Sequence, residues 1–179
     1  MQTAFETERK FLIAMPDPTR LLSEKGASCA RFVQTYLVAE KGVTHRVRKI
    51  TDVHGVRYVE TQKRRVSRLT AEESERAVDG SAYEALLMRA DPACAPIEKT
   101  RYTVPLDDEK GHCMEIDVYP FWKNTAVLEV ELGSEDETFE LPTYIRIIAE
   151  VSDDGRFKNH ALAKSVPSES EWQREAQEE

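Results

Sequence analysis

Hydrophobic and polar residues alternate along much of this chain, in short runs that end at glycine, proline or aspartate. Alternation with a period of two is typical of a β-strand with one buried face. The pattern predicts strands at residues 3–13, 31–40, 43–50, 56–66, 97–105, 112–119 and 126–133. Lys41-Gly42 and His54-Gly55 separate neighbouring runs and favour β-hairpins there.

Helical segments are fewer. Residues 18–25 follow a Pro-Asp-Pro break and end near Gly26, and residues 81–90 are rich in good helix formers. Periodicity does not decide between strand and helix for residues 70–78. Residues 134–165 predict turns and short helices. We expect one domain over residues 1–166, followed by a polar, acidic and frayed tail over 167–179.

Many short strands and few helices in one domain favour a mainly β fold of the α+β class. We expect a closed antiparallel barrel of eight strands with a few external helices, because closure removes the exposed edges of a sheet. The eighth strand depends on residues 70–78, which the alternation alone leaves open.

Composition excludes several classes of protein. The net charge of -8 argues against a nucleic-acid partner. Three cysteines without a CxxC pair argue against disulfides and a zinc site, and favour reduced thiols. The sequence shows neither a signal peptide nor an apolar run long enough to cross a membrane, so we expect a cytoplasmic protein. The sequence does not decide the oligomeric state, and a homodimer is possible.

Charged side chains recur two residues apart on nearly every predicted strand, so they share one face. The opposite face is apolar, with residues such as Ile13, Val47, Ile116 and Val130. The charged positions are Glu6, Glu8 and Lys10; Arg46 and Arg48; Lys63; Glu73 and Glu75; Lys99 and Arg101; Glu115 and Asp117; and Glu129 and Glu131.

Two interpretations compete. For any single strand, a charged face that points to solvent is the simpler explanation. For seven strands together it weakens, because a few helices must then cover the apolar side of a whole barrel. A lumen of acids and bases is costly unless the charges pair or bind ions. It would suit a polyanion held by Arg and Lys and a hard cation held by carboxylates. Carboxylates without Cys or clustered His favour Mg²⁺ or Mn²⁺.

Glu6-Thr-Glu8-Arg-Lys10 resembles the ExExK signature of the CYTH superfamily, the triphosphate tunnel metalloenzymes. Further blocks follow in the family's order, so that the resemblance covers residues 5–166 and is strongest to small bacterial tripolyphosphatases. The blocks are QTYL (34–37), RVR (46–48), TQK (61–63), ESE (73–75), IEKTRY (97–102), EIDV (115–118), LEVEL (128–132), RFKN (156–159) and ALA (161–163).

The resemblance implies an eight-stranded tunnel, with residues 70–78 as a strand, and metal-dependent hydrolysis of a triphosphate. By the same resemblance, Glu6, Glu8, Glu129 and Glu131 are metal ligands. Lys10 is expected to pair with Tyr36 and to have a lowered pKa among the surrounding cations, which suits a base or a water-positioning group. Asp117, Glu73 and Glu75 brace the basic residues or accept a proton. The substrate-binding cations are Arg46, Arg48, Lys63, Lys99, Arg101, Arg156 and Lys158.

Inorganic tripolyphosphate is the expected substrate, and three alternatives stay open. One is a thiamine or nucleoside triphosphatase. Another is an adenylyl cyclase, although no segment of the sequence identifies a base-binding pocket. The third is a barrel that binds polyphosphate without catalysis, which the four glutamates argue against, because binding alone needs only the cations.

Overall fold

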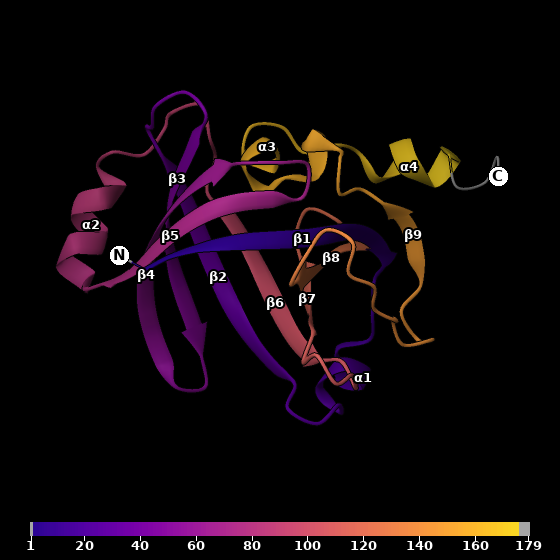
Figure 1. Cartoon of the computed structure of the whole chain (residues 1–179). Helices are drawn as coiled ribbons and strands as arrows, with labels where there is room; N and C mark the ends of the chain where they lie inside the picture. The colour runs from indigo at the N-terminus through magenta and orange to yellow at the C-terminus, as the bar shows by residue number, and fades with distance from the viewer. Residues whose placement is uncertain (1, 176–179) are drawn as a thin grey trace.

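A nine-stranded antiparallel sheet forms the body of the protein in a computed structural model that describes residues 2–175 (Figure 1). The strand order is β5-β4-β3-β2-β6-β7-β8-β1-β9, and an additional pairing of β1 with β5 closes eight of the strands into a barrel. The strands are β1 (Gln2–Ala14), β2 (Ser28–Leu37), β3 (Val43–Asp52), β4 (Gly55–Arg65), β5 (Thr70–Val78), β6 (Ile97–Pro105), β7 (Cys113–Val118), β8 (Thr125–Leu132) and β9 (Ile147–Glu150).

The predicted eight-stranded antiparallel barrel is therefore confirmed, and residues 70–78 are a strand. Gly42 and Gly55 lie next to the two predicted hairpin turns with φ angles of 84° and 120°, which side-chain-bearing residues rarely adopt. The short strand β9 falls in the stretch predicted as turns. It pairs with Phe11–Ile13 of β1, beyond the part of β1 that pairs with β5, and so covers an edge that the barrel leaves open.

Helices and loops cover the apolar outer face of the barrel. Helix α1 (Pro18–Leu22) inserts Leu21 among Ile13, Ile116 and Leu128. Helix α2 (Gly80–Leu87) lies against β2, β3 and β4, on the left of Figure 1. The hydrophobic residues predicted to lie opposite the charges are buried on the outer face of the barrel, beneath these helices and loops.

The chain after β9 closes over one end of the barrel. It forms the 3-10 helix η1 (Gly155–Phe157), α3 (Asn159–Leu162) and α4 (Glu169–Glu175). Trp172 of α4 is buried against Trp122 and Phe157 with edge-to-face ring contacts. The prediction of a frayed tail is wrong for α4, because one buried tryptophan anchors an otherwise polar segment. Residues 176–179 of that predicted tail lie outside the described residues.

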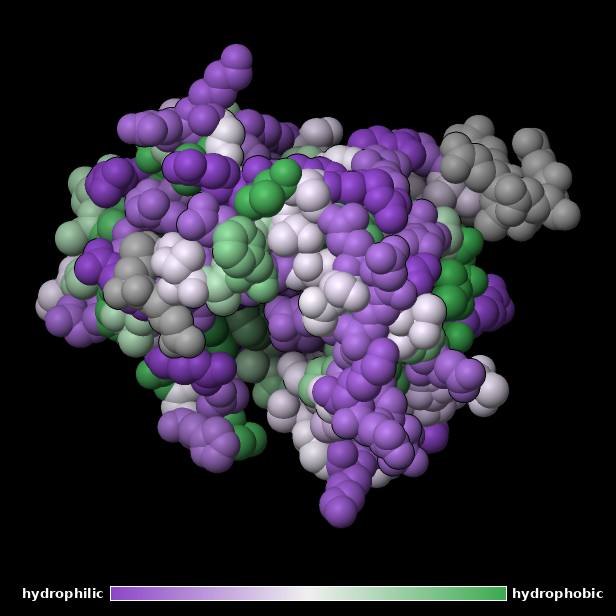
Figure 2. All heavy atoms as spheres, in the orientation of Figure 1, coloured by the Kyte–Doolittle hydropathy of each residue, from purple (hydrophilic) through white to green (hydrophobic). Residues whose placement is uncertain are grey.

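The surface is mostly polar. On the face shown in Figure 2, hydrophilic residues predominate and hydrophobic ones are scattered in separate patches. Within residues 2–175, no helix combines the length and apolar character that crossing a membrane would need. The three cysteines are free thiols, as predicted.

Candidate active site

A cavity of about 720 Å³ occupies the barrel lumen and opens beneath η1 and α3. Ten Lys and Arg residues and seven Glu residues line it, so the lining has a positive excess although the whole chain carries -8. The lining cations are Lys10, Arg46, Arg48, Lys63, Arg65, Arg68, Lys99, Arg101, Lys158 and Lys164, and the acids are Glu6, Glu8, Glu73, Glu75, Glu115, Glu129 and Glu131.

The basic side of the lumen is made by β3 and β6, and its charges are incompletely matched. Burial, together with the neighbouring Arg46, lowers the pKa of Arg48 to about 10, although Glu75 forms an ion pair with it. Burial and the nearby Arg101 lower the pKa of Lys99 to about 8. The Nε–H groups of Arg46 and Arg48 are buried and donate no hydrogen bond within the described structure. Further anionic charge would stabilise this side.

Asp117 lies beneath these cations rather than in the cavity lining. Its carboxylate is fully buried and accepts hydrogen bonds from Lys99 and from Arg101, the latter at 2.7 Å to each oxygen. Burial raises the pKa of Asp117, but the two cations outweigh it and lower the pKa overall. Asp117 is therefore placed to brace the basic residues, and its lowered pKa makes it a poor proton acceptor.

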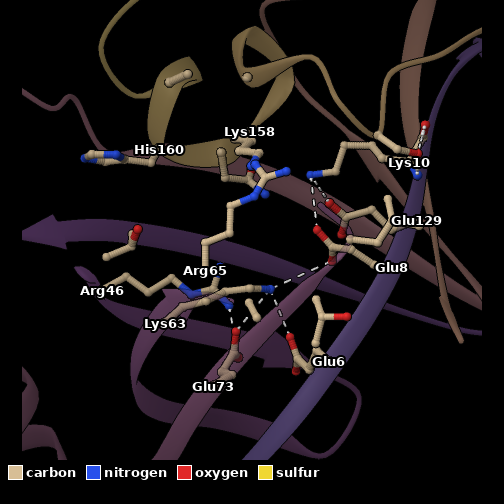
Figure 3. Close-up of a pocket in the computed structure, with 18 of the residues that line it drawn as sticks. Glu6, Glu8, Lys10, Arg46, Lys63, Arg65, Glu73, Glu129, Lys158 and His160 are labelled. Atoms are coloured by element: carbon tan, nitrogen blue, oxygen red, sulfur yellow. Dashed lines mark hydrogen bonds and ion pairs between the residues drawn. The ribbon is translucent and has the colours of Figure 1, made fainter. Parts of the chain in front are cut away.

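Glu73 and Glu75 brace the remaining cations. Glu73 of β5 forms ion pairs with Arg46 at 3.4 Å and with Lys63 at 3.4 Å, and Glu75 holds Arg48. Lys63 also contacts Glu6 at 3.0 Å, so it links strands β1, β4 and β5 inside the barrel (Figure 3). These contacts place the ESE strand where the sequence resemblance implies.

Lys10 differs from its prediction. Burial disfavours its charge, but Glu129 at 2.7 Å and Glu8 at 3.7 Å outweigh that effect and raise its pKa. The expected fall in pKa is wrong, because the Nζ of Lys10 lies beside Glu129 on the neighbouring strand and Glu8 on its own strand rather than among cations. Lys10 is thus a fixed positive charge. The Tyr36 hydroxyl accepts a hydrogen bond from Gln34 at 2.8 Å, and burial raises its pKa to about 12.

The acidic side of the lumen lies on β1, β7 and β8. The strand register sets Glu8 directly opposite Glu131, and Glu115 directly opposite Glu129. Like charges in directly opposed positions destabilise a sheet. Partial enclosure by protein, followed by repulsion from Glu6, Glu115 and Glu8, raises the pKa of Glu131 to about 7. Positive charge is therefore deficient around Glu131, although Lys10 and Lys63 pair with neighbouring acids.

The acidic side fits a hard divalent cation. Its donors are carboxylate oxygens, the ligands that such ions prefer, and an ion among them would relieve the repulsion at Glu131. Two of the four predicted ligands already have basic partners: Lys10 and Arg101 hold the Glu129 carboxylate at 2.7 and 2.9 Å, and Lys63 holds Glu6 at 3.0 Å. All four predicted ligands line the cavity, and Glu115, which pairs with Arg101, joins them.

The predicted site residues lie in the cavity lining or, for Asp117, directly beneath it, and Arg156 is the exception. Arg156 is an exposed residue of η1 and forms ion pairs with Asp154 and Glu171 instead of lining the cavity, whereas Lys158 lines it. The prediction missed Arg65, Arg68 and Lys164 at the cavity rim. The basic run that contains Arg65 and Arg68 was the available signal, but its spacing does not show which members turn inward.

A closed barrel with one basic and one acidic side in its lumen defines a polyanion-binding tunnel protein. The comparisons give the family. The chain is 35% identical over 167 residues to the inorganic triphosphatase of Nitrosomonas europaea, across 90% of this chain and 99% of that protein. It therefore belongs to the same family, the CYTH or triphosphate tunnel metalloenzymes. No family model matches the chain.

Solved structures agree with this placement. The crystal structure of the inorganic triphosphatase NE1496 has 31% identity and a TM-score of 0.56, covering 91% of this chain and 97% of that one. The protein PH1819 from Pyrococcus horikoshii has 18% identity and a TM-score of 0.55, over 73% of this chain and 80% of its own, and supports the fold alone.

Proposed function

We propose that this protein hydrolyses the terminal phosphoanhydride of inorganic tripolyphosphate, with Mg²⁺ or Mn²⁺ as cofactor. The observation that carries the proposal is the division of charge in the lumen. On one side, the pKa values of Arg48 and Lys99 stay lowered despite their acidic partners, and two Nε–H groups have no acceptor; on the opposite side, neighbouring carboxylates raise the pKa of Glu131. A triphosphate and a divalent ion bound side by side would satisfy both.

The basic side would bind the phosphates. Arg46 and Arg48 offer unpaired Nε–H groups, and guanidinium groups can hold phosphate oxygens in pairs. Lys99 and Arg101 add charge beneath them, fixed by Asp117. Because these groups are braced before substrate arrives, little reorganisation is needed to neutralise the charge that develops during phosphoryl transfer.

The acidic side would hold the metal through Glu6, Glu8 and Glu131, with Glu129 and Glu115 next to them. A bound divalent ion would supply charge neutralisation and lower the pKa of a water molecule. Lys10 and Lys63 separate these acids from Glu129 and Glu73, so each carboxylate keeps a defined direction. Hydrolysis adds the oxygen of one water to the terminal phosphorus and breaks its bond to the bridging oxygen. Pyrophosphate and orthophosphate leave, and the water protons pass to products and solvent.

An inorganic substrate fits the lining better than a nucleotide does. The aromatic rings among the described lining residues are Tyr36 and His160, and they pack on each other with centroids 4.8 Å apart. The two rings are tilted by 55° against each other, and the described lining offers no further ring that could stack on the other face of a base. This argues against the adenylyl cyclase and nucleoside triphosphatase alternatives. The relative named an inorganic triphosphatase supports the same choice. We also propose that the protein works in the cytoplasm, which its free thiols support.

The test is phosphate release from tripolyphosphate, ATP and thiamine triphosphate, measured side by side at equal concentration with Mg²⁺ or Mn²⁺. We expect the highest kcat/KM for tripolyphosphate. A higher value for ATP or thiamine triphosphate would reassign the substrate. Tight calorimetric binding of tripolyphosphate without release of phosphate from any of the three would instead support the binding-only alternative.

A further inference from the structure

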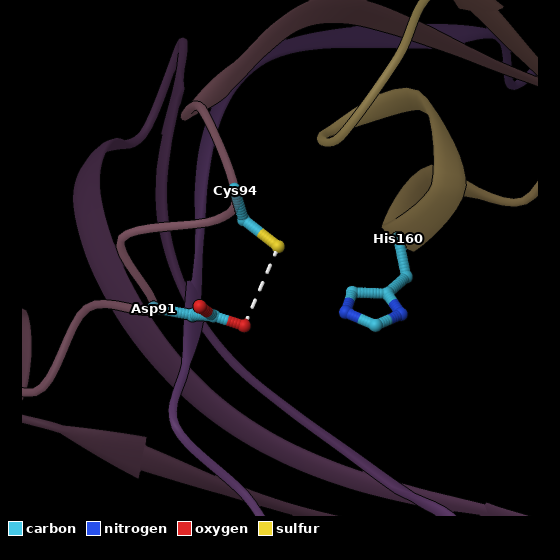
Figure 4. A group of neighbouring side chains, drawn as sticks. All are labelled: Asp91, Cys94 and His160. Carbon is cyan, nitrogen blue, oxygen red and sulfur yellow. Dashed lines mark hydrogen bonds between the residues drawn. The ribbon is translucent and has the colours of Figure 1, made fainter.

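A second cluster of metal-ligating side chains lies outside the acidic side of the lumen. It consists of Asp91, Cys94 and His160, whose ligand atoms all lie within 4.8 Å of one another (Figure 4). It is the one group of its kind among the described residues. None of the lumen glutamates belongs to it, so the cluster is a separate feature.

The loop between α2 and β6 positions two of the three residues. The Cys94 amide donates to the Asp91 carbonyl at 3.0 Å, which closes a turn through Pro92 and brings both side chains to one side. The Ala93 amide donates to one Asp91 carboxylate oxygen at 2.9 Å. The Cys94 thiol lies 3.7 Å from the other oxygen, so one carboxylate oxygen faces the sulfur.

The third residue comes from the distant C-terminal segment. His160 lies in α3, and its ring packs on Tyr36 while it faces the Asp91–Cys94 turn across a gap (Figure 4). Backbone hydrogen bonds hold both sides of the gap: Ala95 donates to Ala163 at 2.7 Å, and Asp91 donates to the Tyr36 carbonyl at 2.9 Å. The three donors are thus presented by anchored segments rather than by free loops.

We propose that Asp91, Cys94 and His160 form a site for a borderline-soft divalent ion of the Zn²⁺ or Co²⁺ class. Sulfur, imidazole nitrogen and carboxylate oxygen are the donors that these ions accept, whereas Mg²⁺ and Mn²⁺ prefer oxygen alone. Three protein ligands leave a fourth position for water. Thiolate and carboxylate together carry two negative charges, which match one divalent ion, and binding releases the thiol proton.

Such an ion would connect the cap, meaning the segment with η1, α3 and α4 that closes one end of the barrel, to the barrel itself. His160, Asn159 and Ala161 of α3 line the tunnel cavity, and the Asp91–Cys94 turn is bonded to β2. Binding would fasten α3 to that turn next to Tyr36. The protein would then bind two classes of metal at separate sites, the hard ion among the lumen glutamates and the softer ion at the cap. This site does not depend on the proposed hydrolase activity, because its donors take no part in it.

Co²⁺ titration of the full-length, chelator-treated protein tests the proposal, followed by competition with Zn²⁺. We expect one equivalent of Co²⁺ to produce a thiolate-to-metal absorption band that Zn²⁺ removes. The glutamates of the lumen hold no sulfur and cannot produce this band. Cys94→Ser should abolish it. Cys113→Ser is the matched control and should leave it unchanged, because that partly buried cysteine lies on β7.

His160→Ala supplies a second measurement if Cys94→Ser fails to fold. It keeps the sulfur but should weaken Zn²⁺ binding at least about tenfold by calorimetry, since even disturbing the residues around a metal site has that effect. Circular dichroism would verify that each variant is folded. A wild-type protein without the band overturns the proposal. So does a band that survives in Cys94→Ser, or equal Zn²⁺ affinity in wild type and His160→Ala.

Discussion

Arg48 is a lumen cation whose single acidic partner does not offset its burial and the neighbouring Arg46. It is mostly enclosed by protein and has Arg46 as a neighbour, and its pKa falls to about 10 despite the ion pair with Glu75. Its Nε–H donates to no described group. A bound phosphate oxygen would supply both the missing charge and the missing acceptor, so Arg48 should contribute to substrate binding rather than to folding.

We predict that Arg48→Ala lowers kcat/KM for tripolyphosphate at least about tenfold, equivalent to roughly 1.4 kcal/mol. The variant should fold, because no apolar contact of the core is removed. Arg57→Ala on β4 is the matched control, since Arg57 is exposed and pairs with Asp52 outside the lumen. Unchanged kinetics in Arg48→Ala would show that this side of the lumen does not bind the phosphates.

Glu131 lies in surroundings with too little positive charge. Enclosure and three neighbouring glutamates raise its pKa to about 7, so its negative charge is disfavoured until a cation arrives. We predict that Glu131→Gln reduces turnover by orders of magnitude. Affinity for tripolyphosphate should change much less, because the Arg and Lys residues remain. Calorimetry and phosphate release measure the two effects, and Glu140→Gln, at an exposed position, is the charge-matched control. Near-normal turnover would remove Glu131 from the metal site.

The same pKa sets a pH dependence of stability in the metal-free protein. A carboxyl with a raised folded-state pKa stabilises the fold when protonated, so its contribution is present below its ordinary value of 4.5 and is lost as pH rises through about 7. Glu131→Gln cannot ionise, so the variant should be no less stable than wild type above pH 7. Denaturant unfolding at pH 5 and pH 8 measures this difference. A variant that is less stable at pH 8 would make Glu131 a structural residue.

At the scale of elements, α4 fastens the cap over the barrel. Trp172 is 5% exposed, contacts Trp122 and Phe157, and its indole N–H donates to Thr125 at 3.3 Å. We predict that Trp172→Ala lowers the free energy of unfolding by about 3–5 kcal/mol, as for other large buried aromatics. Val166→Ala, at a residue 42% exposed, is the control and should change it by less than about 0.5 kcal/mol. Equal stabilities would mean that α4 is not held by its tryptophan.

Local sequence predicts some elements better than others. The barrel strands were predictable where charges alternate with apolar residues, because each strand has one lumen face and one covered face. Only the family resemblance predicted a strand for residues 70–78, because acids such as Glu73 and Glu75 also suit a solvated helix. β9 has no alternation, and the open edge of β1 determines its conformation. α4 depends on Trp172 and a distant aromatic cluster, which its acidic composition hides.

Some features of the site also follow from local sequence, and others do not. Alternation put the charges of each strand on one shared face, and the structure shows that this face lines the lumen. It did not give the pKa of Lys10, which Glu129 on the neighbouring strand determines. Local sequence also could not predict the cluster of Asp91, Cys94 and His160, because most of the C-terminal half separates two of its members from the third. Contacts between distant segments fix both features.

At the scale of the whole molecule, the side chains of the ten basic and seven acidic residues of the lumen are separate from the backbone ladders and hydrophobic clusters that hold the barrel. Removing divalent metal should therefore affect chemistry more than folding. We predict that excess EDTA abolishes phosphate release and that Mg²⁺ or Mn²⁺ restores it. Far-ultraviolet circular dichroism should stay unchanged on chelation, because the barrel strands are held by their own ladders and hydrophobic clusters. Full activity in excess EDTA would contradict the metal-dependent mechanism.

The pairing of β1 with both β5 and β8 also determines when the lumen can come into being. β1 precedes both of its partners in the chain, and one of its ladders needs Thr70–Val78 while the other needs Thr125–Leu132. Ladders between residues so far apart in sequence form slowly, because a long stretch of chain must be closed first. On the ribosome, Glu6, Glu8 and Lys10 therefore cannot face a closed lumen until Leu132 has been made. The tunnel is absent from every nascent chain that ends before β8.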